Sequence, residues 1–214
     1  MVQAAAALSK ARSRGAQVTQ RRILAVVEKL LAQGGEEAVS IREICLRAGV
    51  TAPTIYHHFG DKSALVDRVI DDCFAEFDRS LTSRRIPRDP VEALRRGFDR
   101  YVAYGLRHPS HYRLIFARRH ARPTAAGVAS YEKLRSAVAR IAAAKRLRTS
   151  VDEGAFAFWS TAHGITSLLI AGYEQPGDTI SLVRDALIER LTLPPGEHAR
   201  PQPQRTEVSH GARK

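Results

Sequence analysis

The sequence predicts an all-α fold in two parts, a small N-terminal domain of three helices joined to a larger helical bundle. In most segments apolar residues recur at intervals of three and four, which is the spacing of an amphipathic helix rather than of a strand. Glycine and proline fall mainly between those segments, where turns are expected. The 214 residues are also enough to bury two separate hydrophobic cores.

The first segment, residues 1–17, is rich in alanine and carries basic residues but no acidic one. We expect it to be a disordered basic arm, as chain termini often are. A helix is expected over residues 18–33, because its apolar side chains share one face and Gly34 and Gly35 follow it. This helix would cover the core of the segment that follows.

Two short helices separated by a tight turn are expected in the stretch that begins at Ser40. Ser40 is placed to cap the first helix, and Glu43 would complete a capping box in which each side chain binds the other residue's backbone N–H. Gly49 can adopt the left-handed conformation that ends this helix, and Thr51 is placed to cap the second. The arrangement is a helix-turn-helix, whose second helix typically enters the major groove of DNA. Residues 18–62 are therefore the predicted DNA-binding domain.

The second of these helices contains a Tyr-x-x-Phe-x-x-Lys run that extends just beyond its end. The three residues are Tyr56, Phe59 and Lys62. With this run the chain resembles the TetR family of bacterial transcriptional repressors, closely over residues 18–67. The remainder resembles the family in its helical layout and in a Trp-x-x-x-His-Gly element found in one subgroup of regulatory domains. That element consists of Trp159, His163 and Gly164.

Carried over to this sequence, the DNA contacts of the family fall on seven residues. They are Arg42, Ala52, Pro53, Thr54, Tyr56, His57 and Lys62. Arginine can donate two parallel hydrogen bonds to a guanine edge or a phosphate, hydroxyls and lysine suit phosphates, and a small alanine can approach a thymine methyl group. The resemblance thus implies double-stranded operator DNA as a partner, and the basic arm offers a further contact in a minor groove if it is not simply solvated.

Residues 63–193 are expected to form the helical regulatory and dimerisation domain. A long amphipathic helix begins at Ser63, and further helices are predicted over the ranges that proline-containing loops separate. These ranges are 91–107, 110–118, 124–146 and 178–193. The tail, residues 194–214, contains almost no large apolar residue and is expected to be disordered.

Residues 154–173 contain no Asp, Glu, Lys or Arg, a length that would just cross a bilayer. Polar and small residues in the middle of this run, such as Ser160, Thr161 and Ser167, argue against a membrane span. We expect instead a helix buried on several sides, which pairs with the last helix and with a second copy of the chain. The predicted homodimer interface is then a four-helix arrangement.

An effector pocket is predicted within the regulatory domain, because ligand sites between helices are mostly apolar with a few polar groups. The candidate residues are Phe98, Tyr101, Tyr104, Tyr112, Phe116, Tyr131, Trp159 and His163. An ordinary aromatic core is the alternative. No metal or cofactor is expected, because His108, His111 and His120 have no cysteine or carboxylate beside them at ligand spacing. Nor does the sequence contain a phosphate-binding glycine loop or a nucleophile elbow, so an enzyme is not expected.

The charge of the chain is compatible with a polyanionic partner but does not decide it. The formal net charge is +12 and the pI is near 10.4. Residues 101–150 hold eleven basic residues and a single acid, Glu132. This local excess of positive charge could be a solvated face, or it could bind an acidic effector or the DNA that flanks the operator. No export signal is recognised and both cysteines are expected to be buried thiols, so we expect a cytoplasmic protein.

The sequence therefore predicts a regulator, most often a repressor in this family, that binds a palindromic operator as a dimer and is released by a small-molecule effector. A non-specific architectural DNA-binding protein is the alternative, because it would use the same basic surfaces. The two differ in specificity, since an architectural protein binds random DNA nearly as tightly as any particular site.

Overall fold

The computed structural model describes residues 2–82, 87–116 and 124–197, with side chains from residue 13 onward. Within these ranges the chain is helical throughout, apart from loops and one isolated β-bridge, so the all-α prediction is confirmed. The elements are α1 (Val2–Gly34), η1 (Glu36–Ala38), α2 (Ile41–Ala48), α3 (Ala52–Phe59), α4 (Lys62–Leu81), α5 (Pro90–Arg107), α6 (Pro109–Phe116), α7 (Ala125–Ala143), α8 (Val151–Ile170) and α9 (Thr179–Leu191). None of these helices is long and apolar enough to cross a membrane.

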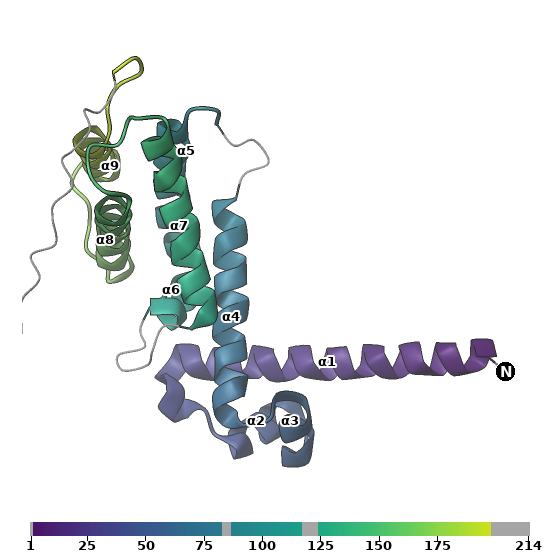
Figure 1. Ribbon diagram of the computed structural model, residues 1–214. Coiled ribbons are helices and arrows are strands. Elements are labelled where there is room, and N and C mark those ends of the chain that lie inside the picture. Colours follow the sequence, from purple (N-terminus) through teal and green to yellow (C-terminus); the bar gives the residue numbers. More distant parts are fainter. Residues whose placement is uncertain (1, 83–86, 117–123, 198–214) are drawn as a thin grey trace, which may run out of the picture.

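Helices α1, α2 and α3 form the N-terminal domain and pack around the first turns of α4 (Figure 1). Its core is a set of aliphatic side chains with no exposed surface, one or two from each helix. These residues are Ile23, Val27, Ile44, Ile55 and Leu65. Because both α1 and α4 contribute to this core, α4 carries the N-terminal domain on one end. With its other end it joins the bundle of α5 to α9, the predicted regulatory bundle (Figure 1).

The first helix differs from its prediction, because α1 begins at Val2 and not near Val18. The expected disordered arm over residues 1–17 is therefore wrong. Residues 4–7 are four alanines, which have the highest intrinsic helix propensity, and no proline interrupts the segment. Figure 1 shows the N-terminal part of α1 extending well beyond the rest of the molecule.

The turn of the helix-turn-helix forms largely as predicted. Gly49 ends α2 with a left-handed conformation, at φ 59°, and Ser40 caps the same helix by accepting a 3.1 Å hydrogen bond from the Glu43 backbone N–H. The reciprocal half of the capping box is absent, because the Glu43 carboxylate pairs with Arg47 at 2.5 Å. Thr51 precedes α3 without a side-chain cap bond, and its hydroxyl lies 3.0 Å from the hydroxyl of Thr54 instead.

Capping and proline chemistry also shift the boundaries of the later helices. Asp61 caps α4 by accepting from the Ala64 backbone N–H, so Lys62 becomes the first helical residue. Helices α5 and α6 both begin at a proline. The N–H of a first helical residue has no acceptor within the helix, so proline, which lacks an N–H, loses no hydrogen bond at this position. A complete capping box does occur, but at the start of α8, between Ser150 and Glu153.

The regulatory bundle is built around α5, which packs most extensively on α8 and also contacts α4, α7 and α9. Beyond α7 the chain pairs with the segment that follows α9, since the Arg148 N–H donates to the Leu191 carbonyl and the Leu193 N–H to the Arg146 carbonyl, both at 2.8 Å. This pairing replaces the predicted continuation of α7 to residue 146. Of the predicted tail, residues 198–214 lie outside the described ranges.

Candidate functional site

The predicted DNA contacts lie around one exposed helix at the end of the N-terminal domain. Helix α3 buries Ile55 against the core and turns Tyr56, which is 48% exposed, toward solvent. Pro53 and His57 are exposed on the same helix, while Ala52 and Thr54 are half-buried. Because the exposed residues Pro53, Tyr56 and His57 lie three and four positions apart on one face of α3, this helix has the geometry of one that can enter a groove.

Two exposed cations flank α3. Arg42 lies in the first turn of α2 and Lys62 in the first turn of α4. The carboxylate next to Lys62, that of Asp61, accepts the capping hydrogen bond of α4 at 2.8 Å. Both cations therefore sit at helix N-termini, where backbone N–H groups add to the attraction for phosphate. The Thr51 hydroxyl, which is not among the seven predicted contacts, joins this surface through its contact with Thr54.

The aromatic residues predicted to line an effector pocket divide into two groups by burial. Phe98, Tyr101, Tyr104 and Tyr112 are buried, whereas Phe116, Tyr131, Trp159 and His163 are half-buried. The second group makes a continuous run of ring contacts from α7 through α8 to α6. Its centroid distances are 5.7 Å for Tyr131 with Trp159, 6.4 Å for Trp159 with Phe116 and 4.8 Å for Phe116 with His163.

Polar groups meet at the inner end of this run. The Nδ1 atom of His163 lies 2.6 Å from the Tyr112 hydroxyl and 3.4 Å from that of Tyr101, and the two hydroxyls are 3.2 Å apart. Burial lowers the pKa of His163 and raises the pKa of both tyrosines, so all three groups are neutral near pH 7. Ser167, one helical turn after His163, completes the cluster at 3.4 Å from Nε2, a partner that its i+4 spacing could have indicated.

Two members of the predicted set belong elsewhere. Phe98 packs edge-on against Phe158 in the centre of the bundle, with ring centroids 5.6 Å apart, and has no exposed surface. Tyr104 points toward α6, where its hydroxyl lies 3.3 Å from Nδ1 of His111. Burial and the nearby Glu76 carboxylate raise the pKa of Tyr104, so its hydroxyl remains protonated.

The basic balance of residues 101–150 is partly offset by acids from other segments. Lys133 pairs with Asp78 of α4, Arg135 with Asp152 of α8 and Arg146 with Asp89. The last two distances are 2.6 Å and 2.7 Å. Basic residues that lack acidic neighbours in the sequence thus form ion pairs between different segments of the bundle. This finding weakens the interpretation of the segment as an anion-binding face.

An open hollow of about 440 Å³ lies at the other end of the bundle, where α5 begins and α9 ends. Its walls carry both charges, including Asp89, Glu92, Arg95, Arg146 and Arg148. The sequence does not reveal this hollow, because its walls come from segments far apart in the chain.

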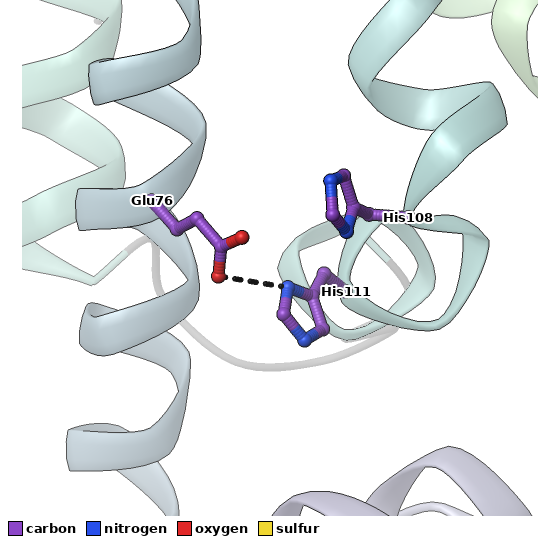
Figure 2. Close-up of side chains that lie close together, drawn as sticks. All are labelled: Glu76, His108 and His111. Atoms are coloured by element: carbon purple, nitrogen blue, oxygen red, sulfur yellow. Dashed lines mark ion pairs between the residues drawn. The ribbon is translucent and has the colours of Figure 1, made fainter.

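The histidines at the junction of α5 and α6 have carboxylate neighbours that the sequence did not reveal. Glu76 of α4 lies beside His108 and His111 (Figure 2), and Glu28 of α1 lies on the other side of His111. The expectation that no carboxylate accompanies these histidines is therefore wrong for His108 and His111, whereas His120 lies outside the described residues.

Comparison with proteins of known family and structure agrees with these features. The sequence profile described as "Bacterial regulatory proteins, tetR family" matches residues 23–69, and that of a "Tetracyclin repressor-like, C-terminal domain" matches residues 94–192. Two solved structures share the fold, each with a TM-score of 0.69. A protein of unknown function from Rhodococcus sp. RHA1 is 24% identical, and the match covers 82% of this chain and 96% of that one. A TetR family transcription regulator from Marinobacter aquaeolei VT8 is 18% identical, and the match covers 85% of this chain and 98% of that one.

Among curated relatives, the HTH-type transcriptional repressor KstR2 of Rhodococcus jostii is 32% identical over 76 residues, which are 34% of this chain and 37% of that protein. The HTH-type transcriptional regulator EthR of Mycolicibacterium smegmatis is 32% identical over 92 residues, 41% of this chain and 42% of that protein. The matched stretches thus span about two fifths of these relatives. Both halves of the fold nevertheless match the same group of regulators, which is not a family of enzymes, and the chain belongs to the tetR family of bacterial regulatory proteins.

Proposed function

We propose that this chain is a ligand-responsive repressor that binds a palindromic operator as a homodimer and leaves it when a small molecule enters the regulatory bundle. The observation that carries the proposal is the exposed face of α3, together with the exposed cations Arg42 and Lys62 in the first turns of α2 and α4. A surface of this kind reads base edges from the helix and fixes its register through phosphates. Such a regulator acts at the chromosome, which in bacteria means the cytoplasm.

The proposed dimer contact lies on the outer face of α8 and α9. Phe156, Ser160, Gly164 and Leu168 are exposed at intervals of one helical turn along α8, and two of the four are large apolar side chains. On α9, Leu182 is 69% exposed. Gly164 and Ser160 leave room for close approach of a second helix at the centre of this stripe, which supports a four-helix contact between two copies.

The proposed effector site is the half-buried aromatic run between α6, α7 and α8. Phe116, Tyr131 and Trp159 offer apolar walls, and the hydroxyls of Tyr101 and Tyr112 meet His163 at the inner end. Because burial lowers the pKa of His163, this end offers neutral hydrogen-bonding groups rather than a positive charge. On α6, Arg113 is exposed and donates to the Ile170 carbonyl at 3.3 Å. The site therefore suits an apolar molecule with a neutral hydroxyl or carbonyl group.

Helix α6 is the element through which the effector would act on the DNA-binding domain. It carries Tyr112 and Phe116 of the effector site and also contacts α1 and α4. A ligand that favours a different position of α6 would change the position of α1 and α4, and with them the separation of the two α3 helices of a dimer. Coupling of this kind is reciprocal, so operator DNA weakens effector binding by the same factor.

The experiment is fluorescence anisotropy of the full-length chain on DNA from the intergenic region next to its gene, with a shuffled duplex of equal length and composition as the control. A repressor should bind the native duplex at least about 10³-fold more tightly than the shuffled one at physiological salt. Equal affinity for the two duplexes, together with binding that covers DNA of any sequence, would favour the architectural alternative.

A further inference from the structure

The strongest unassigned cluster in the described part of the chain lies at the junction of α4 with α5 and α6. Glu76, His108 and His111 each offer one ligand atom here, and these atoms all lie within 4.8 Å of one another. Figure 2 shows the Glu76 carboxylate reaching from α4 toward His111, with the ring of His108 beside it. All three residues are half-buried.

The junction between α5 and α6 brings the two histidines side by side. His108 ends α5, and α6 begins immediately afterward at Pro109, so His111 lies in the first turn of α6. The two imidazole rings stack with centroids 5.6 Å apart. Among the described residues no hydrogen bond reaches the ring nitrogens of His108, which packs on Tyr104 through its face. One imidazole is thus available beside a second imidazole and a carboxylate.

A second carboxylate, that of Glu28, lies where it can hydrogen-bond to His111 without binding the metal itself. The Nδ1 atom of His111 faces Glu76 at 3.4 Å, while Nε2 lies 2.8 Å from Oε1 of Glu28 on α1. Histidine ligands in metal sites almost always donate their other ring N–H to a carboxylate, carbonyl or water. The Nδ1 atom also lies 3.3 Å from the Tyr104 hydroxyl, which can donate to it when no metal is bound. With a metal on Nδ1, the neutral ring needs only to donate from Nε2 to Glu28.

We propose that Glu76, His108 and His111 bind one zinc ion, with Glu28 orienting His111 from outside the coordination shell. Two histidines and one glutamate are a familiar zinc ligand set that leaves one position open. Imidazole and carboxylate ligands also suit other first-row transition metals, whereas Mg²⁺ and Ca²⁺ prefer oxygen ligands alone. Ligand atoms in a tetrahedral zinc site lie about 3.4 Å apart, so the three atoms draw together by about 1 Å through rotations of the side chains.

The location gives zinc a means of regulation. Glu28 belongs to α1 and Glu76 to α4, whereas His111 belongs to α6. An ion at this point ties the DNA-binding domain to the helix that carries Tyr112 and Phe116. Zinc therefore changes operator affinity, a consequence that rests on the proposed function, although zinc binding itself does not.

The test is isothermal titration of ZnCl₂ into the full-length chain after treatment with a chelator. One zinc ion per chain is expected. His108→Gln and Glu76→Gln each remove a ligand and should weaken binding at least about 100-fold, whereas Glu28→Gln should weaken it about 10- to 100-fold and keep the stoichiometry of one. Circular dichroism and a melting curve of each variant establish that it is folded. Visible spectra with Co²⁺ in place of zinc provide a second readout of four-coordinate binding.

The control is the double variant His57→Ala/His58→Ala, which removes the adjacent histidines of α3 from competition and should retain the zinc site. If this variant loses zinc while folded His108→Gln keeps it, the proposed site is wrong. Absence of zinc binding to the wild-type chain also overturns it, and leaves His111 as a hydrogen-bonding partner of Glu28 and Tyr104. Operator affinity is then measured with and without zinc for the wild type and His108→Gln. Zinc binding without any effect on DNA refutes only the regulatory consequence, and a chain that binds zinc but no operator refutes only the proposed function.

Discussion

Gly105 of α5 lies so close to Thr166 of α8 that a Cβ atom at position 105 would overlap the Thr166 methyl group. The same Cβ would lie 3.1 Å from the ring of Tyr112, closer than normal packing allows. Thr166 itself is fully buried and donates to the Ala162 carbonyl at 2.7 Å, so it has no room to move away. The missing side chain at position 105 therefore allows the contact of α5 with α8 and places Tyr112 against His163.

The first prediction follows from this contact. Gly105→Ala should destabilise the protein by about 1–3 kcal/mol, because the added methyl group overpacks a closed interface. The matched control is Gly97→Ala on the same helix, where a Cβ meets nothing within 4 Å. That substitution should stabilise the chain by about 0.5–1 kcal/mol, since glycine is unfavourable inside a helix. Urea denaturation of both variants measures the difference, and equal stabilities would contradict the packing described for Gly105.

The second prediction concerns the dimer. Leu182→Glu places a charge on an exposed apolar side chain of α9 and should shift the chain from dimer to monomer in analytical ultracentrifugation. Leu187 is a poorer site for this test, because it packs against the core of its own chain. Glu189→Lys, on an exposed position of the same helix, serves as a control for a change of charge. A Leu182→Glu protein that stays dimeric would place the interface elsewhere.

The third prediction concerns phosphate contacts. Lys62→Ala should weaken binding to all DNA sequences and reduce the slope of log affinity against log salt by about one unit. Lys133→Ala is the control, because Lys133 lies on α7 and pairs with Asp78. It should leave the slope unchanged. Anisotropy titrations at four or more salt concentrations give both slopes, and a wild-type slope for Lys62→Ala would remove this residue from the DNA contacts.

The fourth prediction uses the pKa of Asp71. Burial raises this pKa, and the neighbouring carboxylates Asp67 and Asp72 raise it further. One oxygen of the group, Oδ1, is buried without a hydrogen-bond partner among the described residues. Because the folded state holds the proton more tightly than the unfolded state, stability falls as pH rises from the unfolded pKa near 3.8 through the raised value, and it stays lower at neutral pH.

Asp71→Asn should consequently raise the melting temperature at pH 7 by a few degrees, and this gain should shrink as the pH falls through the raised pKa and be largely lost below about 4. The comparison variant is Asp72→Asn, which removes an exposed carboxylate paired with Arg68 at 3.1 Å; because this carboxylate only adds to the shift that burial causes in the pKa of Asp71, its loss should change the melting temperature much less. Melting curves between pH 3 and pH 8 make the comparison. A gain for Asp71→Asn that does not depend on pH would mean that its cause is packing rather than ionisation.

The sequence was most informative where structure depends on near neighbours. Gly49 and Ser40 mark the ends of α2 because each acts on a backbone a few residues away. The prediction failed for residues 1–17, because a chain terminus is expected to be disordered whereas the alanines of this one favour a helix. It also failed for the capping box at Ser40, because Arg47 competes for the Glu43 carboxylate.

Contacts between distant residues could not be predicted. Glu28 and His111 are 83 residues apart, and only the packing of α6 on α1 brings them together. The aromatic set illustrates the same limit, because composition could not separate Phe98, which is core, from Trp159, which is half-buried on α8. Which aromatic residues face a ligand depends on the rotation of each helix about its axis. That rotation is set by the packing of the whole core, which the pattern of a single helix does not reveal.

Selection from a random library of double-stranded DNA by the full-length protein is the most direct test of the central claim, that two copies of this chain read an operator through α3. The selected sequences should contain an inverted repeat whose half-sites are centred about 10–10.5 base pairs apart, or a multiple of that spacing. The variant Tyr56→Ala, which truncates an exposed side chain of α3, should enrich this repeat poorly. A selection that converges on no inverted repeat with the wild-type protein would contradict the account.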